Sequence, residues 1–129
     1  MMDEQTRRFV RQRANHRCEY CGLHQDDSPL ARLQIEHIIP KKHGGTDVLE
    51  NLALACIGCN LKKSSDLAGL DAATGLLVRL FDPRTQRWSD HFRWDGVFIV
   101  GLTDVGRTTV QVLDLNSEER IVARIGVLD

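Results

Sequence analysis

Apolar residues in this chain occur in short groups, separated by charged, polar or glycine-containing stretches, and these groups predict short elements. Residues 3–15 carry Phe9 and Val10 among arginines and glutamines, a composition that favours a helix. Residues 33–39 alternate partly between apolar and polar positions, so they predict a short strand that ends before Pro40. A helix and a short strand this close together are typical of a small α+β fold.

The chain then passes through a loop into a second helix. Residues 41–47 contain a glycine pair that permits positive φ and close approach of the backbone to a ligand. Residues 60–67 predict the helix. The character of the sequence changes after this point, so we expect residues 1–68 to form one module. Residues 69–129 are expected to be an α/β extension packed on that module, without being an independent domain.

Within the extension the strongest local pattern is a hairpin. Residues 91–94 and 97–100 flank Asp95-Gly96, a two-residue turn of the kind that joins antiparallel strands. Residues 76–81 predict a further strand. Two helices are expected after the hairpin, one capped by Thr103 and ending at Leu115, and one begun by a capping box of Asn116 and Glu119.

Composition adds a constraint on stability. The chain has 129 residues, of which 42% are hydrophobic and only 5% aromatic, so a large aromatic core is not expected. The first half alone is too small to be stable through burial, and domains of that size often depend on a metal or on disulfides. The start of the chain does not resemble a signal peptide, and no apolar run approaches the roughly 18 residues of a membrane span. We therefore expect a cytoplasmic protein without a membrane partner.

The formal net charge of −1 does not identify a dedicated nucleic-acid binder, because such proteins are usually basic. The distribution of charge matters more than its sum, because contacts to phosphates are local. Basic residues gather in three groups, which are Arg7, Arg8, Arg11, Arg13 and Arg17, then Lys41 and Lys42, then Lys62 and Lys63. These groups are consistent with modest, salt-sensitive binding to nucleic acid, or with an ordinary solvated surface.

The four cysteines form two matched pairs, Cys18 with Cys21 and Cys56 with Cys59. Two residues between thiolates allow both sulfurs of a tight turn to face one Zn2+ at about 2.3 Å. In a reducing compartment this pattern favours metal over a disulfide or a redox role. We therefore expect a structural zinc that holds two distant stretches of chain together.

The residues between and beside the cysteine pairs suit phosphodiester chemistry. His37 offers an imidazole that can deprotonate water near neutral pH. Glu36 and Asn60 offer the oxygen ligands that Mg2+ or Mn2+ prefers. Neighbours in a regular strand point to opposite faces, so the strand has to twist or end at this point if Glu36 and His37 are to serve one site.

Taken in order, the first cysteine pair, Glu36-His37, Gly44-Gly45, Asn51 and the second cysteine pair followed by Asn60 resemble the HNH endonuclease family. The resemblance covers residues 16–64 and is closest to the bacterial branch whose hairpin is stapled by a four-cysteine zinc. It implies a ββα-metal fold, also called a His-Me finger. The sequence departs from the family motif at Asn60, where the name-giving motif has histidine, and at Glu36, where aspartate is frequent.

The resemblance also implies roles for individual residues. His37 would be the general base, and Asn51 would brace the loop and help to orient His37. Glu36 and Asn60 would hold a catalytic Mg2+ or Mn2+, while the zinc would stay out of the chemistry. The lysines expected to contact DNA phosphates are Lys41, Lys42 and Lys63.

These observations predict an endonuclease that hydrolyses DNA, acting as a monomer or a weak homodimer. Two alternatives remain open, a non-catalytic zinc module that recognises nucleic acid and a protein-interaction subunit of a defence or mobile-element system. Individual residues could also have purely structural roles, with His37 as a structural histidine and Asn60 as a helix N-cap. Trp88, Phe92 and Trp94 are expected to pack against the zinc module rather than stack on bases.

Overall fold

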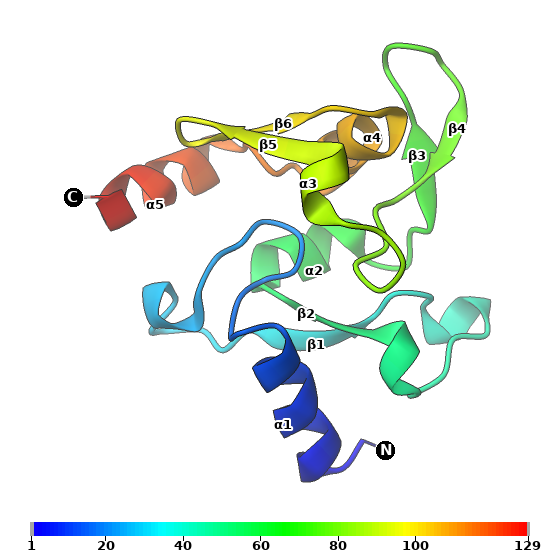
Figure 1. The fold of residues 1–129 in the computed structure, drawn as a ribbon, viewed down its shortest axis with the longest axis vertical. Coiled ribbons are helices and arrows are strands. Elements are labelled where there is room, and N and C mark those ends of the chain that lie inside the picture. Colours follow the sequence, from blue (N-terminus) through cyan, green and yellow to red (C-terminus); the bar gives the residue numbers. More distant parts are fainter. Residues whose placement is uncertain (1, 129) are drawn as a thin grey trace.

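The computed structural model describes residues 2–128, which form five α-helices and three two-stranded antiparallel sheets. Figure 1 shows α1 and the β1–β2 pair at one end of the molecule and the elements of the later chain at the other. The expected α+β class is confirmed. None of the helices in this described part is both long enough and apolar enough to cross a membrane.

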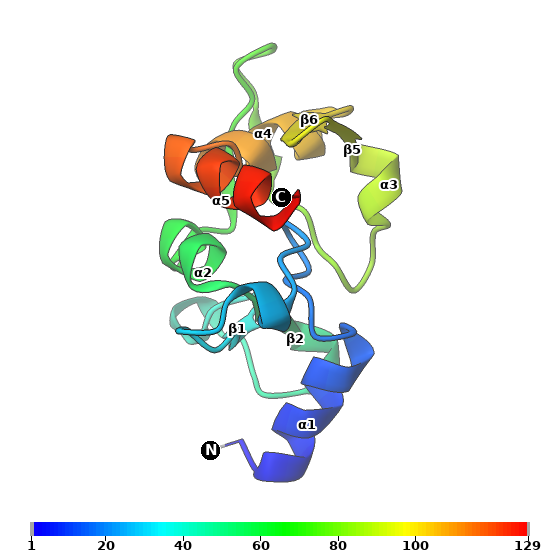
Figure 2. The same cartoon turned by 90° about the vertical axis from the view of Figure 1, so that its left-hand side faces the viewer.

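The middle of the chain forms a ββα unit. Strands β1 (Gln34–His37) and β2 (Leu52–Ala55) pair antiparallel, with His37 opposite Leu52, and α2 (Ile57–Lys63) follows almost directly. All four residues of β2 are buried. Figures 1 and 2 show why, because α1 lies on one side of the β1–β2 pair and α2 on the other.

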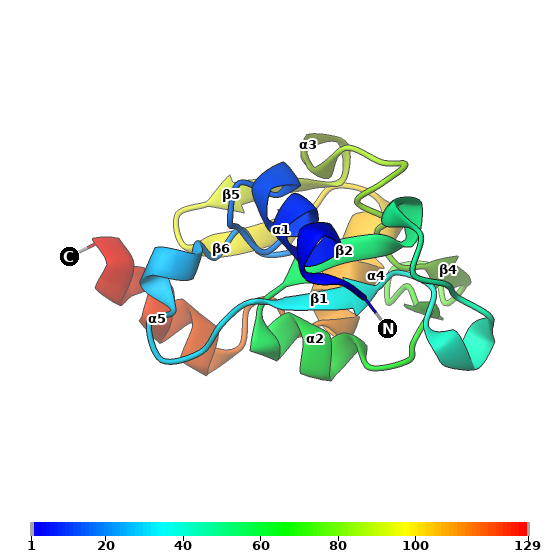
Figure 3. The same cartoon turned by 90° about the horizontal axis from the view of Figure 1, so that it is seen from below.

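Helix α1 (Glu4–Arg13) confirms the first predicted helix, although it is shorter than the predicted range 3–15. Asp3 caps it by accepting a hydrogen bond from the backbone N–H of Thr6 at 2.8 Å. At its other end the Arg13 guanidinium donates to the carbonyl oxygens of Leu49 and Leu52 at 3.0 and 2.7 Å. These bonds hold α1 across β2, as seen from below in Figure 3.

The helix expected over residues 60–67 is displaced toward the N-terminus. Observed α2 begins at Ile57, inside the second cysteine pair, and Cys56 is its N-cap, with Sγ accepting from the backbone N–H of Cys59 at 3.4 Å. The turn that brings the two sulfurs together is thus the first turn of the helix. Asn60 consequently lies in the second turn, so the interpretation of Asn60 as an N-cap was wrong. Ser64, with φ of +49°, ends the helix.

The later chain contains two hairpins and three helices. The predicted hairpin is confirmed, but its turn is one residue later, because Asp95 pairs with Phe98 and Gly96, with φ of +61°, begins the turn. Thr103 caps α4 as expected, and the helix ends at Val112 rather than Leu115. The elements are β3 (Ala68–Leu70), β4 (Leu77–Arg79), α3 (Trp88–His91), β5 (Phe92–Asp95), β6 (Phe98–Gly101), α4 (Asp104–Val112) and α5 (Glu118–Leu128).

The capping box predicted at Asn116 does not form. The Asn116 side chain instead bonds the backbone of Ile99 in both directions, at 2.8 Å each, and so ties the start of α5 to β6. Ser117 takes the capping position, because its Oγ accepts from the backbone N–H of Arg120 at 3.4 Å. The Asn116 amide therefore bonds to the distant residue Ile99 instead of forming the predicted capping box with Glu119.

Both halves of the chain contribute to one buried core. The Tyr20 ring meets Phe81 edge-on with centroids 6.4 Å apart, and Phe81 in turn packs against Phe92 at 5.2 Å. The Trp88 indole N–H donates to the Tyr20 carbonyl at 2.9 Å. Trp88 and Phe92 therefore pack rather than stack on a ligand, whereas Trp94 is 46% exposed.

Candidate functional site

The four cysteines come together as both sequence pairs predict. All four are buried, and their sulfurs lie within 4.8 Å of one another, with Cys21 and Cys56 3.6 Å apart. A tetrahedral zinc with bonds of about 2.3 Å separates its sulfurs by roughly 3.8 Å, so the cluster fits a zinc ion. Burial raises the pKa of the Cys18 thiol, whereas hydrogen bonds from neighbouring thiols lower the pKa of Cys56. Four thiolates cannot share so small a space without a cation.

An arginine that the sequence did not single out lies against this cluster. Arg120 of α5 places Nη1 3.3 Å from the Cys59 sulfur. Burial lowers the pKa of Arg120, but the charges of Cys59, Cys56 and Cys21 outweigh that effect and raise it overall. No local pattern could have identified this contact, because the two residues are 61 positions apart in the chain.

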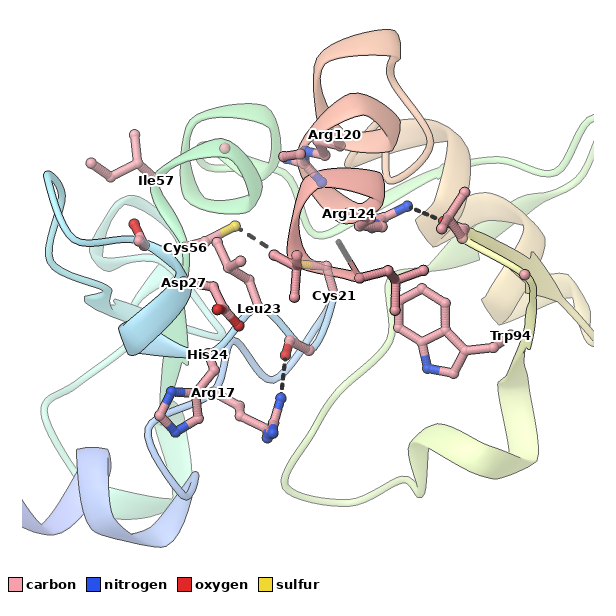
Figure 4. A pocket seen from close by; sticks show the side chains of 18 residues that line it. Arg17, Cys21, Leu23, His24, Asp27, Cys56, Ile57, Trp94, Arg120 and Arg124 are labelled. Atoms are coloured by element: carbon pink, nitrogen blue, oxygen red, sulfur yellow. Dashed lines mark hydrogen bonds between the residues drawn. The ribbon is translucent and has the colours of Figure 1, made fainter.

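A cavity of about 430 Å³ adjoins the cysteines between the first pair, the β5–β6 turn and α5. Figure 4 shows Arg120 and Arg124 on α5 beside Cys56 and Cys21, with Trp94 on the far side. The Arg124 guanidinium lies 5.4 Å from the centre of the Trp94 ring and donates to the Val97 carbonyl at 3.0 Å. These contacts hold α5 to the β5–β6 hairpin beside the cysteine cluster.

His37 is the last residue of β1, and its imidazole is only partly covered, with 21% of the side chain exposed. Nε2 lies 2.7 Å from Oδ1 of Asp47, and this hydrogen bond lowers the pKa of the Asp47 carboxyl. Because an ionised carboxylate only accepts, Nε2 carries the proton and Nδ1 keeps its lone pair. Sequence reasoning missed Asp47, which lies in the loop ten positions after His37 and has no spacing that indicates it.

Asn51 ties down the loop that begins after His37. Its Oδ1 accepts from the backbone N–H of Ile39 at 2.8 Å, and its Nδ2 donates to the carbonyls of Ile39 and Thr46 at 3.0 and 2.9 Å. The Asn51 carbonyl also accepts from Ile38 N–H at 2.8 Å. All of these bonds act on the backbone that connects His37 to Asp47.

Glu36 points away from His37, as alternation along a strand requires. It is 5% exposed, Tyr20 donates its hydroxyl to Oε1, and the Lys63 ammonium lies 3.1 Å from Oε2. Burial raises the pKa of the Glu36 carboxyl, and the positive charge of Lys63 partly offsets this. The structure therefore does not bring the Glu36 carboxylate and the His37 ring to one site.

Lys63 is placed differently from the phosphate contact expected of it. It is 2% exposed, and its ammonium donates to the His37 and Ile38 carbonyls at 3.2 and 3.0 Å besides pairing with Glu36. With three acceptors around it, Lys63 stabilises the junction of β1 and α2. Lys41 and Lys42 are exposed, and Lys41 lies 3.6 Å from Asp47.

Asn60 lies one turn before Lys63 on α2 and donates from Nδ2 to Oε1 of Gln34 at 2.6 Å. Across residues 2–128 no group donates to its side-chain oxygen Oδ1, which leaves that oxygen available to a cation, whereas its backbone carbonyl accepts from Ser64 N–H at 2.9 Å. The cysteine cluster is the one group of three or more His, Cys, Asp or Glu in this part of the chain that could hold a metal. A second, catalytic ion would therefore need ligands from Asn60 and from a bound substrate.

The family model for HNH endonuclease matches residues 18–66. These residues belong to the HNH endonuclease family. The chain is also similar to the Septu protein PtuB of Bacillus thuringiensis, with 28% identity over 111 residues. That match covers 84% of this chain but 40% of PtuB, so the chain spans about two fifths of the length of this curated relative.

Within the HNH segment the structure separates the expected site residues into two groups. His37 and Asn51 meet at the loop after β1, where Asp47 joins them. Glu36 and Lys63 face each other between β1 and α2, with Asn60 one turn away. The imidazole and the buried carboxylate thus lie on opposite faces of the same strand.

Proposed function

We propose that this chain is a metal-dependent HNH endonuclease that hydrolyses phosphodiester bonds in DNA, with His37 as the general base. The observation that supports it is the partly exposed His37 ring, held through Nε2 by Asp47 so that Nδ1 is the basic atom. A base of this kind contributes roughly 10²–10⁴-fold to a rate. The membership of residues 18–66 in the HNH family makes phosphodiester hydrolysis the reaction to which it applies.

In the proposed reaction His37 Nδ1 accepts a proton from water, and the resulting hydroxide attacks phosphorus. The bond between phosphorus and the 3′ oxygen breaks, and that oxygen takes a proton from solvent, which gives 5′-phosphate and 3′-hydroxyl ends. Asn60 would hold Mg2+ or Mn2+ through its side-chain oxygen Oδ1, and such an ion neutralises non-bridging phosphate oxygens and the leaving oxygen when bound. Glu36 could join that ion only by leaving Tyr20 and Lys63.

The four cysteines are proposed to bind one Zn2+ that has no part in the reaction. Their burial and their closed set of four sulfurs are typical of structural zinc, because a catalytic zinc keeps one position open to water.

The test is nicking of supercoiled plasmid in Mg2+ or Mn2+ by the wild type and by His37→Ala. We expect the variant to lose at least roughly 100-fold in rate. His43→Ala is the matched control, because His43 lies in the same loop, is exposed, and has no assigned role. If His37→Ala nicks plasmid as fast as the wild type, His37 is not the general base.

One observation favours a second candidate, a non-catalytic zinc module that recognises nucleic acid. Glu36, expected as a ligand for the catalytic ion, is sealed between Tyr20 and Lys63. Titration with Mn2+ separates the two functions. A weaker divalent site besides the tight zinc, lost in Asn60→Ala, supports the nuclease, whereas a single zinc with DNA binding and no nicking supports the module.

A further inference from the structure

A second cavity, of about 650 Å³, lies between α1, the start of β1 and the first turns of α2. Its polar lining includes Arg7 and Arg11 from α1, Arg32 and Gln34 at the start of β1, and Asn60 from α2. It follows an open strand edge, since β1 has only β2 as a neighbour. The cavity therefore adjoins the first two residues, Gln34 and Ile35, of the strand that ends at His37.

The charge in this cavity is positive and only partly balanced. Three arginines face one carboxylate, Glu4, so two positive charges remain. Among residues 2–128 the guanidinium groups of Arg7 and Arg32 have neither a hydrogen-bond nor an ion-pair partner, although the backbone N–H of Arg7 donates to the Asp3 carbonyl. Two other arginines of the chain form ion pairs, Arg84 with Glu19 and Arg107 with Asp71.

The geometry also keeps these guanidinium groups together. Arg7 and Arg11 are four residues apart on α1 and so lie on one face of the helix. Arg11 is fixed by its donation to the Leu33 carbonyl at 2.8 Å, next to Arg32. Burial and the positive charges of Arg32 and Arg7 lower the pKa of Arg11, although Glu4 opposes this. Like charges held this close favour an anionic ligand that relieves their repulsion.

We propose that this cavity binds the phosphate backbone of a DNA strand through Arg7, Arg11 and Arg32 and leads that strand to Asn60 and His37. The proposal rests on the proposed function for the identity of the anion. It places the DNA contacts of the N-terminal helix outside the HNH segment, which begins at residue 18. It also assigns to arginines the role that buried Lys63 does not fill.

Distances along β1 set where these contacts fall on the substrate. Gln34 precedes His37 by three residues, which is about 10 Å in a strand. Successive nucleotides of one strand rise by about 3.4 Å. The arginine contacts are therefore expected at phosphates other than the one that is cut.

The test measures how tightly the zinc-loaded full chain binds fluorescein-labelled duplex DNA, without added Mg2+ or Mn2+. Binding is monitored by fluorescence anisotropy at salt concentrations between 50 and 300 mM. Each lost phosphate contact is expected to lower the slope of log K against log salt by about 0.9. For Arg7→Ala/Arg32→Ala we expect about 10-fold weaker binding at the lowest salt and a slope smaller by roughly 1.8. Arg8→Ala is the matched control, because Arg8 is exposed on the same helix but does not line the cavity, and it should change affinity less than twofold.

The outcomes separate this proposal from the proposed function. If the double variant binds as Arg8→Ala does, the cavity is not the DNA site, whether or not the wild type cuts plasmid. If binding falls with the expected slope while the wild type never cuts, the cavity is the DNA site and the nuclease assignment fails. Arg7→Lys/Arg32→Lys should keep most of the slope, which excludes a merely structural loss, and thermal unfolding checks that each variant is folded.

Discussion

At the scale of single residues, the proposed chemistry depends on one imidazole and on the carboxylate that orients it. His37 is partly exposed at the end of β1, and Oδ1 of Asp47 accepts a hydrogen bond from Nε2 at 2.7 Å. A carboxylate in this position selects the tautomer and stabilises the imidazolium that forms when a proton is taken up. Asp47 is thus a positioning residue that acts through His37.

Replacement of Asp47 by Asn should therefore affect turnover more than binding. We expect Asp47→Asn to lower kcat by at least about 10-fold with little change in KM for DNA, because the amide no longer enforces the productive tautomer. The measurement is steady-state nicking over a range of plasmid concentrations. Asp47→Glu should recover part of kcat. Equal losses in kcat and in folded stability for both variants would instead indicate a structural role.

At the scale of elements, β1 and α2 are joined by a buried ion pair rather than by apolar packing alone. Lys63 in the last turn of α2 reaches Glu36 in the middle of β1, and both side chains are nearly inaccessible. The same ammonium also donates hydrogen bonds to the carbonyls of His37 and Ile38. Such a pair fixes the angle between strand and helix, and with it the distance from His37 to Asn60.

Removal of only one member of this ion pair should strongly lower the free energy of unfolding. We expect Lys63→Met to lower the free energy of unfolding by about 3–5 kcal/mol, because it leaves the Glu36 charge buried without its cation. Glu36→Gln/Lys63→Met should lose less, because no charge is stranded. Denaturant unfolding of the zinc-loaded protein measures both. Lys62→Met, at an exposed ion pair with Asp114, is the control and should cost no more than about 1 kcal/mol.

The pH dependence gives a second check on the same pair. Burial raises the folded-state pKa of Glu36 above the ordinary value near 4.3 of the unfolded chain. The folded protein then binds the Glu36 proton more readily, so this residue contributes a loss of stability as pH rises from about 4.3 through its folded pKa. We expect the loss to be larger in Lys63→Met. A variant whose stability was insensitive to pH in that window would contradict the buried, ionising carboxyl.

At the scale of the whole molecule, the cysteine cluster connects three distant stretches of chain. It joins the turn after α1 to the start of α2, and Arg120 adds α5 through its contact with Cys59. The shared core of Tyr20, Phe81 and Phe92 continues the connection into the extension. Loss of the metal would therefore affect more than the HNH segment.

Removal of zinc by a chelator should unfold both halves together. Both tryptophans, Trp88 and Trp94, lie in the extension, so their fluorescence reports on it while zinc release reports on the cysteines. We expect the two signals to change in one transition, because structural zinc supplies roughly 10 kcal/mol or more to such small modules. Chelator already saturated with zinc is the control. Tryptophan emission that stayed native after zinc loss would show that the extension folds independently.

Much of the HNH segment could be predicted from local patterns, and those parts share a physical basis. The paired cysteines carry their geometry in their spacing, because two residues between thiolates permit little else in a tight turn. Helix α1, capped by Asp3, and the hairpin at Gly96 also depend on residues close together in the chain. For such features local residues alone predict the element, and its place to within two residues.

Tertiary structure alone decided which polar side chains meet. Alternation on β1 sent Glu36 toward Tyr20 and Lys63, and His37 toward Asp47, although the two neighbours had been expected to serve one site, with Glu36 as a metal ligand and His37 as the base. The placement of Asn116 on Ile99 was decided in the same way. A charged or amide group takes the partner that satisfies it best after burial, and that partner can come from anywhere in the folded chain. Sequence order determined the metal-binding frame, and packing determined the contacts inside it.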